Sequence, residues 1–315
     1  MTRPRTPSND SDSLPGGIAG SVEISVIVPS YNSERTIRAC LEAILKQETG
    51  RRYEVIVVDS STDETAGIIE REYKEVRVVR KRERTYAGAA RNAGVRESRG
   101  RYVVMIDSDC VVAPDAVERM VRRHEQGEYA AVGGSVANGT PGSLSGTIGF
   151  LIEFREFMPT ARFRLEKGIP TASIAYRREV FERHGYFDED MWPAEDLLFN
   201  WRLYEAGEKL LFDPEIRALH LNRTGWRGVL SHQAKLGGTS ALARKRGALP
   251  GGILLRHPAL IIFMPFYRTM KAALWFFSND KKAFVFFLAA WPLYLLAALC
   301  WSWGFMGEAL KPRGR

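Results

Sequence analysis

Residues 24–33 read Ile-Ser-Val-Ile-Val-Pro-Ser-Tyr-Asn-Ser, an apolar run that ends at a proline and a short polar stretch. A continuous apolar run of this length, without alternation, is typical of a strand buried on both faces. Stretches with helical periodicity separate it from later runs of the same kind. These later runs are Val55–Val58, which precedes Asp59, Val76–Val79, and Tyr102–Ile106, which precedes Asp107. The alternation predicts an α/β fold in which helices cover both faces of a mainly parallel sheet.

Local signals predict two further features of this part of the chain. Ser33 is the expected N-cap of the first helix, because its hydroxyl can accept a hydrogen bond from the backbone of the first turn. Residues 137–172 are rich in glycine and then in aromatic side chains, without a clean period. Leu210–Phe212 is expected to form a last, short strand.

Acidic residues follow two of the predicted strands directly. In parallel sheets, ligands bind beyond the carboxyl ends of the strands, where Asp59, Asp107 and Asp109 fall. Two carboxylates two residues apart, as in Asp107-Ser108-Asp109, can turn toward one hard cation such as Mg²⁺ or Mn²⁺. The same tripeptide also occurs in ordinary turns, and Asp59 also suits a helix cap, so the residues alone leave both explanations open.

Four more residues have both a functional and a structural explanation. Tyr31 could stack on a nucleobase or belong to an ordinary loop, and Arg91 could meet a phosphate or pack within a helix of small residues. Asp196 could be a general base at the mouth of a cleft, or an acid that stabilises a helix start through the dipole. His220 could be a third metal ligand or a packed histidine.

The charge of the chain is divided unevenly between its two parts. From Arg223 to Arg315 there are 14 Lys and Arg against 2 Asp and Glu, whereas residues 1–222 have 31 against 35. The basic excess lies beside the apolar C-terminus and not on the α/β part, which favours an anionic membrane surface as partner and disfavours nucleic acid. Residues 1–21 are rich in Pro, Ser and Gly and are expected to be a disordered tail.

Two apolar stretches near the C-terminus predict membrane attachment. Phe284–Gly307 has 24 residues and no charge, which is long enough to cross a bilayer, and Pro258–Phe277 is interrupted by Arg268 and Lys271. We expect residues 226–256 to be a basic amphipathic segment at the membrane interface and residues 257–315 to be membrane-associated or transmembrane. Three cysteines far apart in sequence indicate a reducing cytosol around the remaining domain.

Six motifs occur in one order along the α/β part. They are Ile-Val-Pro-Ser-Tyr-Asn (27–32), Val-Val-Asp-Ser-Ser-Thr-Asp (57–63), Ala-Arg-Asn-Ala-Gly (90–94), Ile-Asp-Ser-Asp (106–109), Gly-Tyr-Phe-Asp-Glu (185–189) and Glu-Asp (195–196). This ordered set resembles the family-2 glycosyltransferases, which have the GT-A fold, a Rossmann-like mixed and mainly parallel sheet. The resemblance covers about Val22 to Arg223 and implies a catalytic domain at residues 22–225.

The resemblance also implies roles for single residues. Pro29, Tyr31, Asp59, Arg91, Asp107 and Ser108 would bind the nucleotide-sugar donor. Asp107 and Asp109 match the D-x-D motif that holds a divalent metal, Mg or Mn, and His220 sits where some members supply a further ligand. Asp196 matches the general base of an inverting transfer.

The resemblance leaves the acceptor open, and with the membrane segment it implies a lipid-linked or cell-envelope glycan. A cytosolic nucleotide-sugar donor places the catalytic domain on the cytosolic face, at the inner membrane in a bacterium. The chain departs from processive synthases because residues 223–227 read Arg-Thr-Gly-Trp-Arg where their Q-x-x-R-W motif would follow. This favours transfer of a single sugar. The alternatives are a nucleotidyltransferase, which usually has a glycine-rich loop after its first strand, and a non-catalytic nucleotide-sugar binder, which would be expected to lack the acids.

Overall fold

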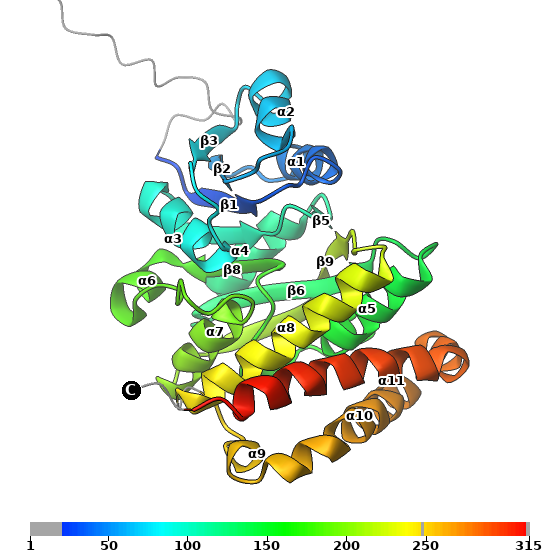
Figure 1. Cartoon of the computed structure of the whole chain (residues 1–315). Coiled ribbons are helices and arrows are strands. Elements are labelled where there is room, and N and C mark those ends of the chain that lie inside the picture. Colours follow the sequence, from blue (N-terminus) through cyan, green and yellow to red (C-terminus); the bar gives the residue numbers. More distant parts are fainter. Residues whose placement is uncertain (1–20, 247–248, 313–315) are drawn as a thin grey trace, which may run out of the picture.

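The computed structural model describes residues 21–246 and 249–312, so the predicted tail lies outside the described residues apart from its last position. One nine-stranded sheet, ordered β3-β2-β1-β4-β8-β6-β9-β5 with β7 paired to β9, runs through the catalytic part (Figure 1). The strands are β1 (Ile24–Ser30), β2 (Tyr53–Asp59), β3 (Arg77–Arg80), β4 (Tyr102–Ile106), β5 (Cys110–Val112), β6 (Ala131–Asn138), β7 (Arg164–Glu166), β8 (Ser173–Arg177) and β9 (Leu210–His220).

The sheet is mixed, and its N-terminal half is parallel throughout. β1 pairs in parallel with β2 and β4, and β2 pairs in parallel with β3. β8 is antiparallel to both β4 and β6, and thereby joins this half to the parallel pair β6 and β9. The ends of β1, β2 and β4 therefore lie along one edge of the sheet, as predicted from the sequence.

Alternate residues of the central strands face two different cores. In β1, Ile24 and Val28 belong to one buried cluster and Ile27 to another, and in β4 Val104 and Val103 divide in the same way. Both faces exclude water, which explains why these strands are continuously apolar in sequence.

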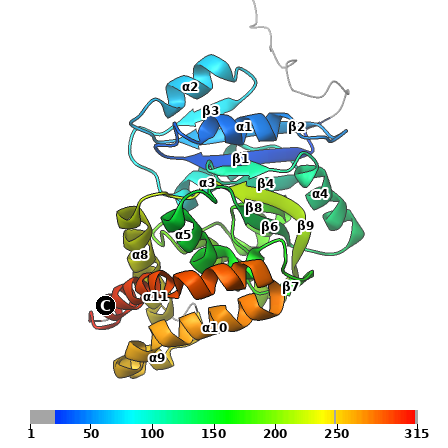
Figure 2. The ribbon, with the colours of Figure 1, turned by 90° about the vertical axis from the view of Figure 1, so that its right-hand side faces the viewer.

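The helices lie on both faces of this sheet and along one end of it (Figures 1 and 2). The helices are α1 (Ile37–Leu45), α2 (Thr65–Glu72), α3 (Ala87–Glu97), α4 (Ala116–Gln126), α5 (Leu144–Phe154), the 3-10 turn η1 (Arg155–Phe157), α6 (Arg178–His184), α7 (Glu195–Glu205), α8 (Trp226–Lys245), α9 (Ile253–Arg256), the 3-10 turn η2 (Pro258–Phe263), α10 (Met264–Asn279) and α11 (Lys281–Ala309). Side chains of α1, α2 and α4 enter the first core, and those of α3, α6 and α7 enter the second.

The prediction that Ser33 is the N-cap of α1 was wrong, because the helix begins three residues further along the chain than a cap at Ser33 requires. The N-cap is Thr36, and the carbonyl of Ser33 accepts the backbone N–H groups of Thr36 and Ile37 at 2.9 and 2.8 Å. The hydroxyl of Ser33 instead lies 2.8 Å from that of Ser108, across the edge of the sheet. Ser33 therefore joins the first loop to the acidic loop after β4.

Tertiary packing explains two further features of local structure, and one of them corrects the predicted length of a strand. Residues 137–172 contain α5, whose residues are buried nearly all round, so it carries no amphipathic period. The strand predicted at Leu210–Phe212 extends to His220, because β9 passes Asp213 and Pro214 at a register shift opposite Gly134/Ser135 and pairs again beyond it. This extension carries His220 to the edge of the sheet.

The C-terminal helices are docked on the catalytic domain. α10 and α11 form a hairpin along the end of the molecule opposite β3 and α2 (Figures 1 and 2). Phe276 of α10 and Phe287 and Tyr294 of α11 belong to the same buried cluster as the strands β1 and β4. The apolar core of the domain thus continues into the hairpin without a break.

α8 crosses α11 so closely that only glycines fit at the contact. A Cβ on Gly237 of α8 would lie 1.8 Å from the carbonyl oxygen of Trp301, and a Cβ on Gly304 of α11 would lie 1.8 Å from that of Ala234. Lys245, at the end of α8, donates to the carbonyls of Glu308 and Lys311 at the C-terminus of α11. These contacts hold α11 against α8 at several points along its length.

The outer faces of the hairpin are apolar and exposed. Their large exposed side chains are Ile262, Phe263, Phe266, Tyr267, Met270, Leu274 and Phe277 before the turn, and Val285, Leu288, Trp291, Leu296, Leu299 and Trp303 after it. The segments Pro258–Asn279 and Lys281–Ala309 are long and apolar enough to cross a membrane. An exposed apolar surface of this extent marks an interaction with a membrane or another apolar partner.

The glycine contact between α8 and α11 yields a prediction with a matched control. A Cβ on the adjacent Gly238 would meet nothing nearer than 3.6 Å. Since alanine stabilises an α-helix by about 1 kcal/mol relative to glycine, we expect Gly238→Ala to leave the melting temperature unchanged or raise it. Gly237→Ala forces the helices apart and should lower the free energy of unfolding by about 1–3 kcal/mol. Thermal unfolding of both variants in detergent checks this, and equal melting temperatures would contradict the contact.

Candidate active site

One large cavity of about 1100 Å³ opens at the carboxyl edge of the parallel strands. Its lining includes residues from the loops after β1 and β4, the start of α7, the end of β9 and one side of α8. Of the site residues predicted from the sequence, those that line it are Pro29, Tyr31, Arg91, Asp107, Ser108, Asp109, Asp196 and His220. Asp59 does not line it: its side chain is fully buried and accepts hydrogen bonds from the backbone N–H and the hydroxyl of Ser61 at 3.2 and 2.6 Å.

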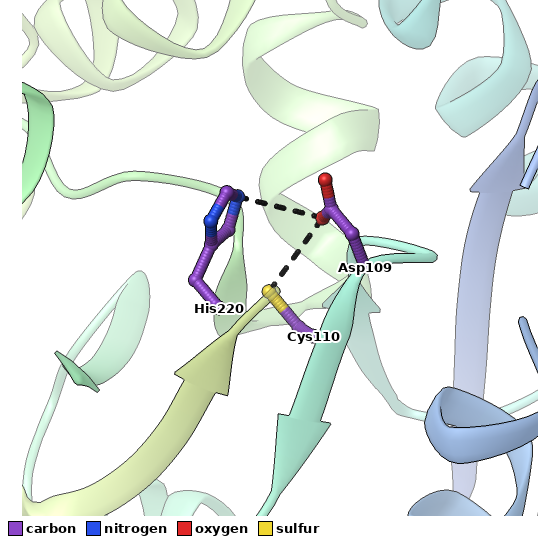
Figure 3. Close-up of side chains that lie close together, drawn as sticks. All are labelled: Asp109, Cys110 and His220. Atoms are coloured by element: carbon purple, nitrogen blue, oxygen red, sulfur yellow. Dashed lines mark hydrogen bonds and ion pairs between the residues drawn. The ribbon is translucent and has the colours of Figure 1, made fainter. Parts of the chain in front are cut away.

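Asp109, Cys110 and His220 form a compact group with metal-ligating atoms (Figure 3). Nε2 of His220 lies 3.5 Å from Oδ1 of Asp109, and Sγ of Cys110 lies 4.0 Å from the same oxygen. Cys110 opens β5 and His220 closes β9, and the two residues are register partners in this antiparallel pair. The pairing of β5 with β9 therefore brings together residues 110 positions apart in sequence.

The hydrogen-bond network fixes the tautomer of His220. The backbone N–H of Thr140 donates to Oδ1 of Asn138 at 3.0 Å, so the atom of Asn222 that lies 2.8 Å from this oxygen is its amide nitrogen. Oδ1 of Asn222 then accepts the Nδ1–H of His220 at 2.8 Å. In the neutral ring the lone pair is then on Nε2, which lies 3.5 Å from the carboxylate of Asp109. Two acceptors that face each other in this way fit a bound cation.

The chemistry of these donors fits a hard divalent ion. Carboxylate oxygen suits Mn²⁺ or Mg²⁺, imidazole nitrogen is a ligand of transition-metal ions such as Mn²⁺, and phosphate oxygens of a donor would complete the coordination. Burial, reinforced by the charges of Asp109 and Asp107, raises the pKa of the Cys110 thiol well above its usual range. Burial thus disfavours the thiolate of Cys110, which packs beside the pair.

Arg91 links the acidic loop after β4 to the start of α7. Its guanidinium is 3% exposed and donates to Oδ1 of Asp107 and to Oε1 of Glu195, each at 2.6 Å. Burial works to lower the pKa of Arg91, but the two carboxylates outweigh it and raise that pKa above its usual range. In this arrangement the charge of Arg91 is directed at two acids of the protein.

Acidic groups outnumber the cation at this point of the cavity. Burial raises the pKa of both Asp107 and Glu195 against the opposing effect of Arg91, and the charges of Asp109 and Asp196 raise it further. Two carboxylates thus share one guanidinium, and two more lie near enough to act on them electrostatically. Such an excess of negative charge is relieved by a bound cation, independently of the tautomer of His220.

Asp196 lies in the first turn of α7 and is only partly buried. Its Oδ2 accepts from the backbone N–H and the hydroxyl of Thr171 at 3.3 and 3.5 Å. The loop before it is held by α8, because the hydroxyl of Thr239 donates to the carbonyl of Pro193 at 2.9 Å. Asp196 thus lines the cavity from the first turn of α7, after a loop that α8 supports. No cation among the described residues forms an ion pair with it.

Aromatic and basic groups line the part of the cavity beside β1. The guanidinium of Arg84 lies 4.4 Å from the ring of Tyr31 and 5.2 and 5.9 Å from those of Tyr86 and Trp192. Asn32 adopts a left-handed conformation, with φ of 52°, and its side chain accepts the backbone N–H of Thr62 at 2.9 Å. Flat rings and a cation at this place suit a base and a phosphate.

Sequence reasoning missed three residues of this site. Asn222 orients His220, Arg84 stacks on Tyr31, and Glu195 was quoted in a motif without a role although it is a partner of Arg91. The Glu-Asp motif could have indicated a role for Glu195, because one acid of such a pair can position the other. Asn222 and Arg84 lie outside the quoted motifs.

The glycosyl transferase family 2 profile matches residues 25–185, about half of the chain, and the chain therefore belongs to this family. The chain is 30% identical over 199 residues to the uncharacterized glycosyltransferase EpsJ of Bacillus subtilis, which covers 59% of this chain and 57% of EpsJ. It is 24% identical over 260 residues to a Methanococcus voltae enzyme named dolichyl N-acetyl-alpha-D-glucosaminyl phosphate 3-beta-D-2,3-diacetamido-2,3-dideoxy-beta-D-glucuronosyltransferase, covering 76% of this chain and 79% of that one.

A solved structure shares the fold over nearly the whole chain. The mannosyltransferase PcManGT of Pyrobaculum calidifontis, in complex with GDP-Man and Mn²⁺, aligns with a TM-score of 0.61 at 21% identity and covers 95% of this chain and 88% of its own. The predicted family and the predicted GT-A fold with a C-terminal pair of apolar helices are confirmed. The chain spans less than two thirds of EpsJ, and the activity of such relatives is not transferred with the fold.

The fixed tautomer of His220 yields the second prediction. Asn222→Ala frees the ring and should weaken Mn²⁺ binding roughly 10- to 100-fold, as loss of an outer-shell partner does at other metal sites. Titration calorimetry with MnCl₂ and purified protein measures this without any need for turnover. His184→Gln is the control, because His184 pairs with Glu208 at 2.8 Å and does not line the cavity. Unchanged Mn²⁺ affinity in Asn222→Ala would show that the ring does not depend on this anchor.

Proposed function

We propose that this protein is an inverting, metal-dependent glycosyltransferase that moves one sugar from a nucleotide-sugar donor to an acceptor at a membrane surface. The observation that carries the proposal is the convergence, in one cavity, of a metal-type pair, Asp109 and His220, and a separate carboxylate, Asp196. Membership of family 2 supports glycosyl transfer over the nucleotidyltransferase alternative. The fold shared with an enzyme solved with GDP-Man and Mn²⁺ supports the donor class and the metal.

Each group has a task in a single displacement. A divalent ion held by Asp109 and His220, with Asp107 beside it, would act as a Lewis acid toward the diphosphate leaving group. Tyr31 and Pro29 would pack against the nucleoside, and Ser108 would contact the diphosphate. Asp196 would take the proton of the acceptor hydroxyl as it attacks, and attack on the face opposite the leaving group inverts the anomeric carbon. Arg91 holds the metal loop and the base helix at a fixed separation.

The attachment we propose is a hairpin that lies in one leaflet of the membrane. The buried side chains of α11 recur from Phe287 to Phe305 on one face, which is packed on the protein along nearly its whole length. A helix covered by a water-soluble domain in this way cannot cross the bilayer while that domain stays in water. Its opposite, exposed apolar face and that of α10 would enter the headgroup and acyl boundary.

The charges of the hairpin support this orientation. Lys271 pairs with Glu156 of η1 at 3.1 Å, and Arg268 lies 4.2 Å from the ring of Trp301, so both cations of α10 are directed at the protein. In a two-span arrangement, the basic groups at 281–282 and at Lys311 would face opposite compartments. In the leaflet arrangement both groups lie at one surface, where anionic headgroups attract them. The Methanococcus relative, named for a dolichyl phosphate-linked acceptor, supports an acceptor held in that surface.

The third prediction tests the base. Asp196→Asn keeps the shape of the side chain and removes its basicity, so turnover should fall on the order of 10²–10⁴-fold while donor binding stays within a few-fold. Release of nucleoside diphosphate, measured across a panel of nucleotide sugars with Mn²⁺ or with chelator, identifies the donor and tests the metal in the same assay. Asp190→Asn, an exposed acid in the loop before α7, is the control. Full turnover by Asp196→Asn would show that this residue only begins a helix, and full turnover in chelator would overturn metal dependence.

The fourth prediction tests the attachment. Single cysteines replacing Lys282, at the hairpin turn, and Lys311, after α11, should both react with an impermeant maleimide from the side of the catalytic domain. Cys300 is replaced by Ala in this background, whereas Cys40 and Cys110 are buried. Labelling of the two positions from opposite sides would show that α11 spans the bilayer. Full-length protein recovered without detergent at low salt would refute membrane attachment altogether.

A further inference from the structure

Part of the cavity, which we call the chamber, is lined by residues of α8 and of the segment α9–α11. This chamber is lined by four apolar side chains and two arginines. They are Leu236, Leu254, Met264 and Trp301, with Arg244 and Arg268. None of the roles described above for donor, metal or base uses these residues.

Arg268 is a cation without a counterion. Its guanidinium lies 4.2 Å from the ring of Trp301, and its buried Nε has no hydrogen-bond partner. In the described part of the chain no acid lies within ion-pair distance of it. Glu156, the acid that acts on it electrostatically, already pairs with Arg155 at 2.8 Å and with Lys271 at 3.1 Å.

Arg244 repeats this situation from the other side of the chamber. Its Nη1 donates to the carbonyl and the hydroxyl of Ser240 at 2.8 and 2.6 Å, and its buried Nε also lacks a partner. No described acid pairs with it, and Arg268 is close enough for the two like charges to repel. Charges that are partly removed from water are normally paired, so two adjacent arginines without an acid indicate an anionic ligand.

We propose that Arg244 and Arg268 bind the phosphate of a lipid-linked acceptor. Arginine presents a planar fork of donors that matches phosphate oxygens, and the apolar residues of the chamber suit the first units of a hydrocarbon chain. Ile262 and Phe263, 66% and 65% exposed, lie in the segment that leads from the chamber to the apolar face of the hairpin. The proposal rests on the proposed function, because it assigns the acceptor of that reaction.

The position of Arg244 on α8 indicates how far the phosphate lies from the metal. Its guanidinium is turned back along the helix onto Ser240, next to Thr239, which contacts the loop before Asp196. His232, which lines the metal end of the cavity, is eight residues from Ser240, about 12 Å along the helix axis. The bound phosphate is therefore remote from the metal and is not itself the nucleophile. The acceptor is a sugar carried on the lipid phosphate, whose hydroxyl needs a base such as Asp196, as an anionic phosphate would not.

The test uses full-length protein in detergent and three probes: farnesyl phosphate, farnesol and inorganic phosphate. Wild type should bind farnesyl phosphate more tightly than either other probe. Arg268→Gln and Arg244→Gln should each weaken that binding roughly 10- to 100-fold and leave farnesol binding unchanged, because each removes a charged hydrogen bond. Lys282→Gln, an exposed cation at the hairpin turn, is the matched control and should bind as wild type does.

Thermal unfolding separates a ligand site from a structural role. Removing a cation without a counterion should leave the melting temperature of Arg268→Gln unchanged or raise it, and added farnesyl phosphate should raise it less than in wild type. A large loss of stability in Arg268→Gln and Arg244→Gln, with farnesyl phosphate affinity unchanged in whatever folds, would overturn the proposal. Equal affinity of wild type for inorganic phosphate and farnesyl phosphate would overturn its lipid part.

Donor assays on the same preparation keep this proposal distinct from the proposed function. Mn²⁺-dependent donor hydrolysis without arginine-dependent farnesyl phosphate binding would refute the phosphate site and leave the glycosyltransferase standing. Arginine-dependent binding of farnesyl phosphate without any metal-dependent donor turnover would support the phosphate site and refute the proposed glycosyltransferase activity. Transfer of a sugar directly onto farnesyl phosphate would overturn the inference that the bound phosphate is not the nucleophile.

Discussion

The double ion pair of Arg91 is the interaction on which the geometry of the active site depends. One buried guanidinium is shared by Asp107 at the end of β4 and Glu195 at the start of α7, each 2.6 Å away. Asp107 lies in the same motif as Asp109, and Glu195 in the same motif as Asp196. Asp109 and Asp196 are the two residues to which we assign the chemistry. Removing one partner of such a buried network leaves the others uncompensated, at a cost of about 3–5 kcal/mol. The pairing therefore fixes the distance between metal loop and base helix, and a donor and an acceptor must fit that distance.

α8 extends this constraint from the cavity to the membrane surface. One side of it contacts the loop before Asp196 through Thr239, and another contacts α11 where Gly237 admits the carbonyl of Trp301. A displacement of the hairpin is thus transmitted through close-packed backbone to the loop that carries the base, since packed interiors transmit strain. From the sequence, residues 226–256 were expected to be an amphipathic segment that rests on headgroups. In our proposal α8 instead links the loop before Asp196 to the hairpin, and the cavity is lined by both.

The sequence predicted those parts of the site that local rules position. Strand ends lie at one edge of a parallel sheet, so Asp107 and Asp109 were expected there and line the cavity. The partner of Arg91 was not predictable, because Glu195 lies 104 positions away and the choice between a phosphate and two carboxylates depends on tertiary packing. The predicted role of Asp59 in binding the nucleoside stays a prediction: its buried carboxylate accepts hydrogen bonds from Ser61 and is not among the residues that line the cavity.

The C-terminal third shows the limit of composition as a predictor. Length and apolarity are the same for a helix that crosses a bilayer and for one that lies on it with one face on protein, so Phe284–Gly307 was compatible with both. The difference lies in where the polar groups of the hairpin point, and this is set by partners far away in sequence, Glu156 for Lys271 and Glu308 for Lys245. Arg268 and Arg244 have no acid within ion-pair distance among the described residues, and both line the part of the cavity that faces the hairpin. The acceptor that we propose fits this arrangement, because its anionic phosphate would stay near the membrane while its neutral sugar reaches the catalytic centre.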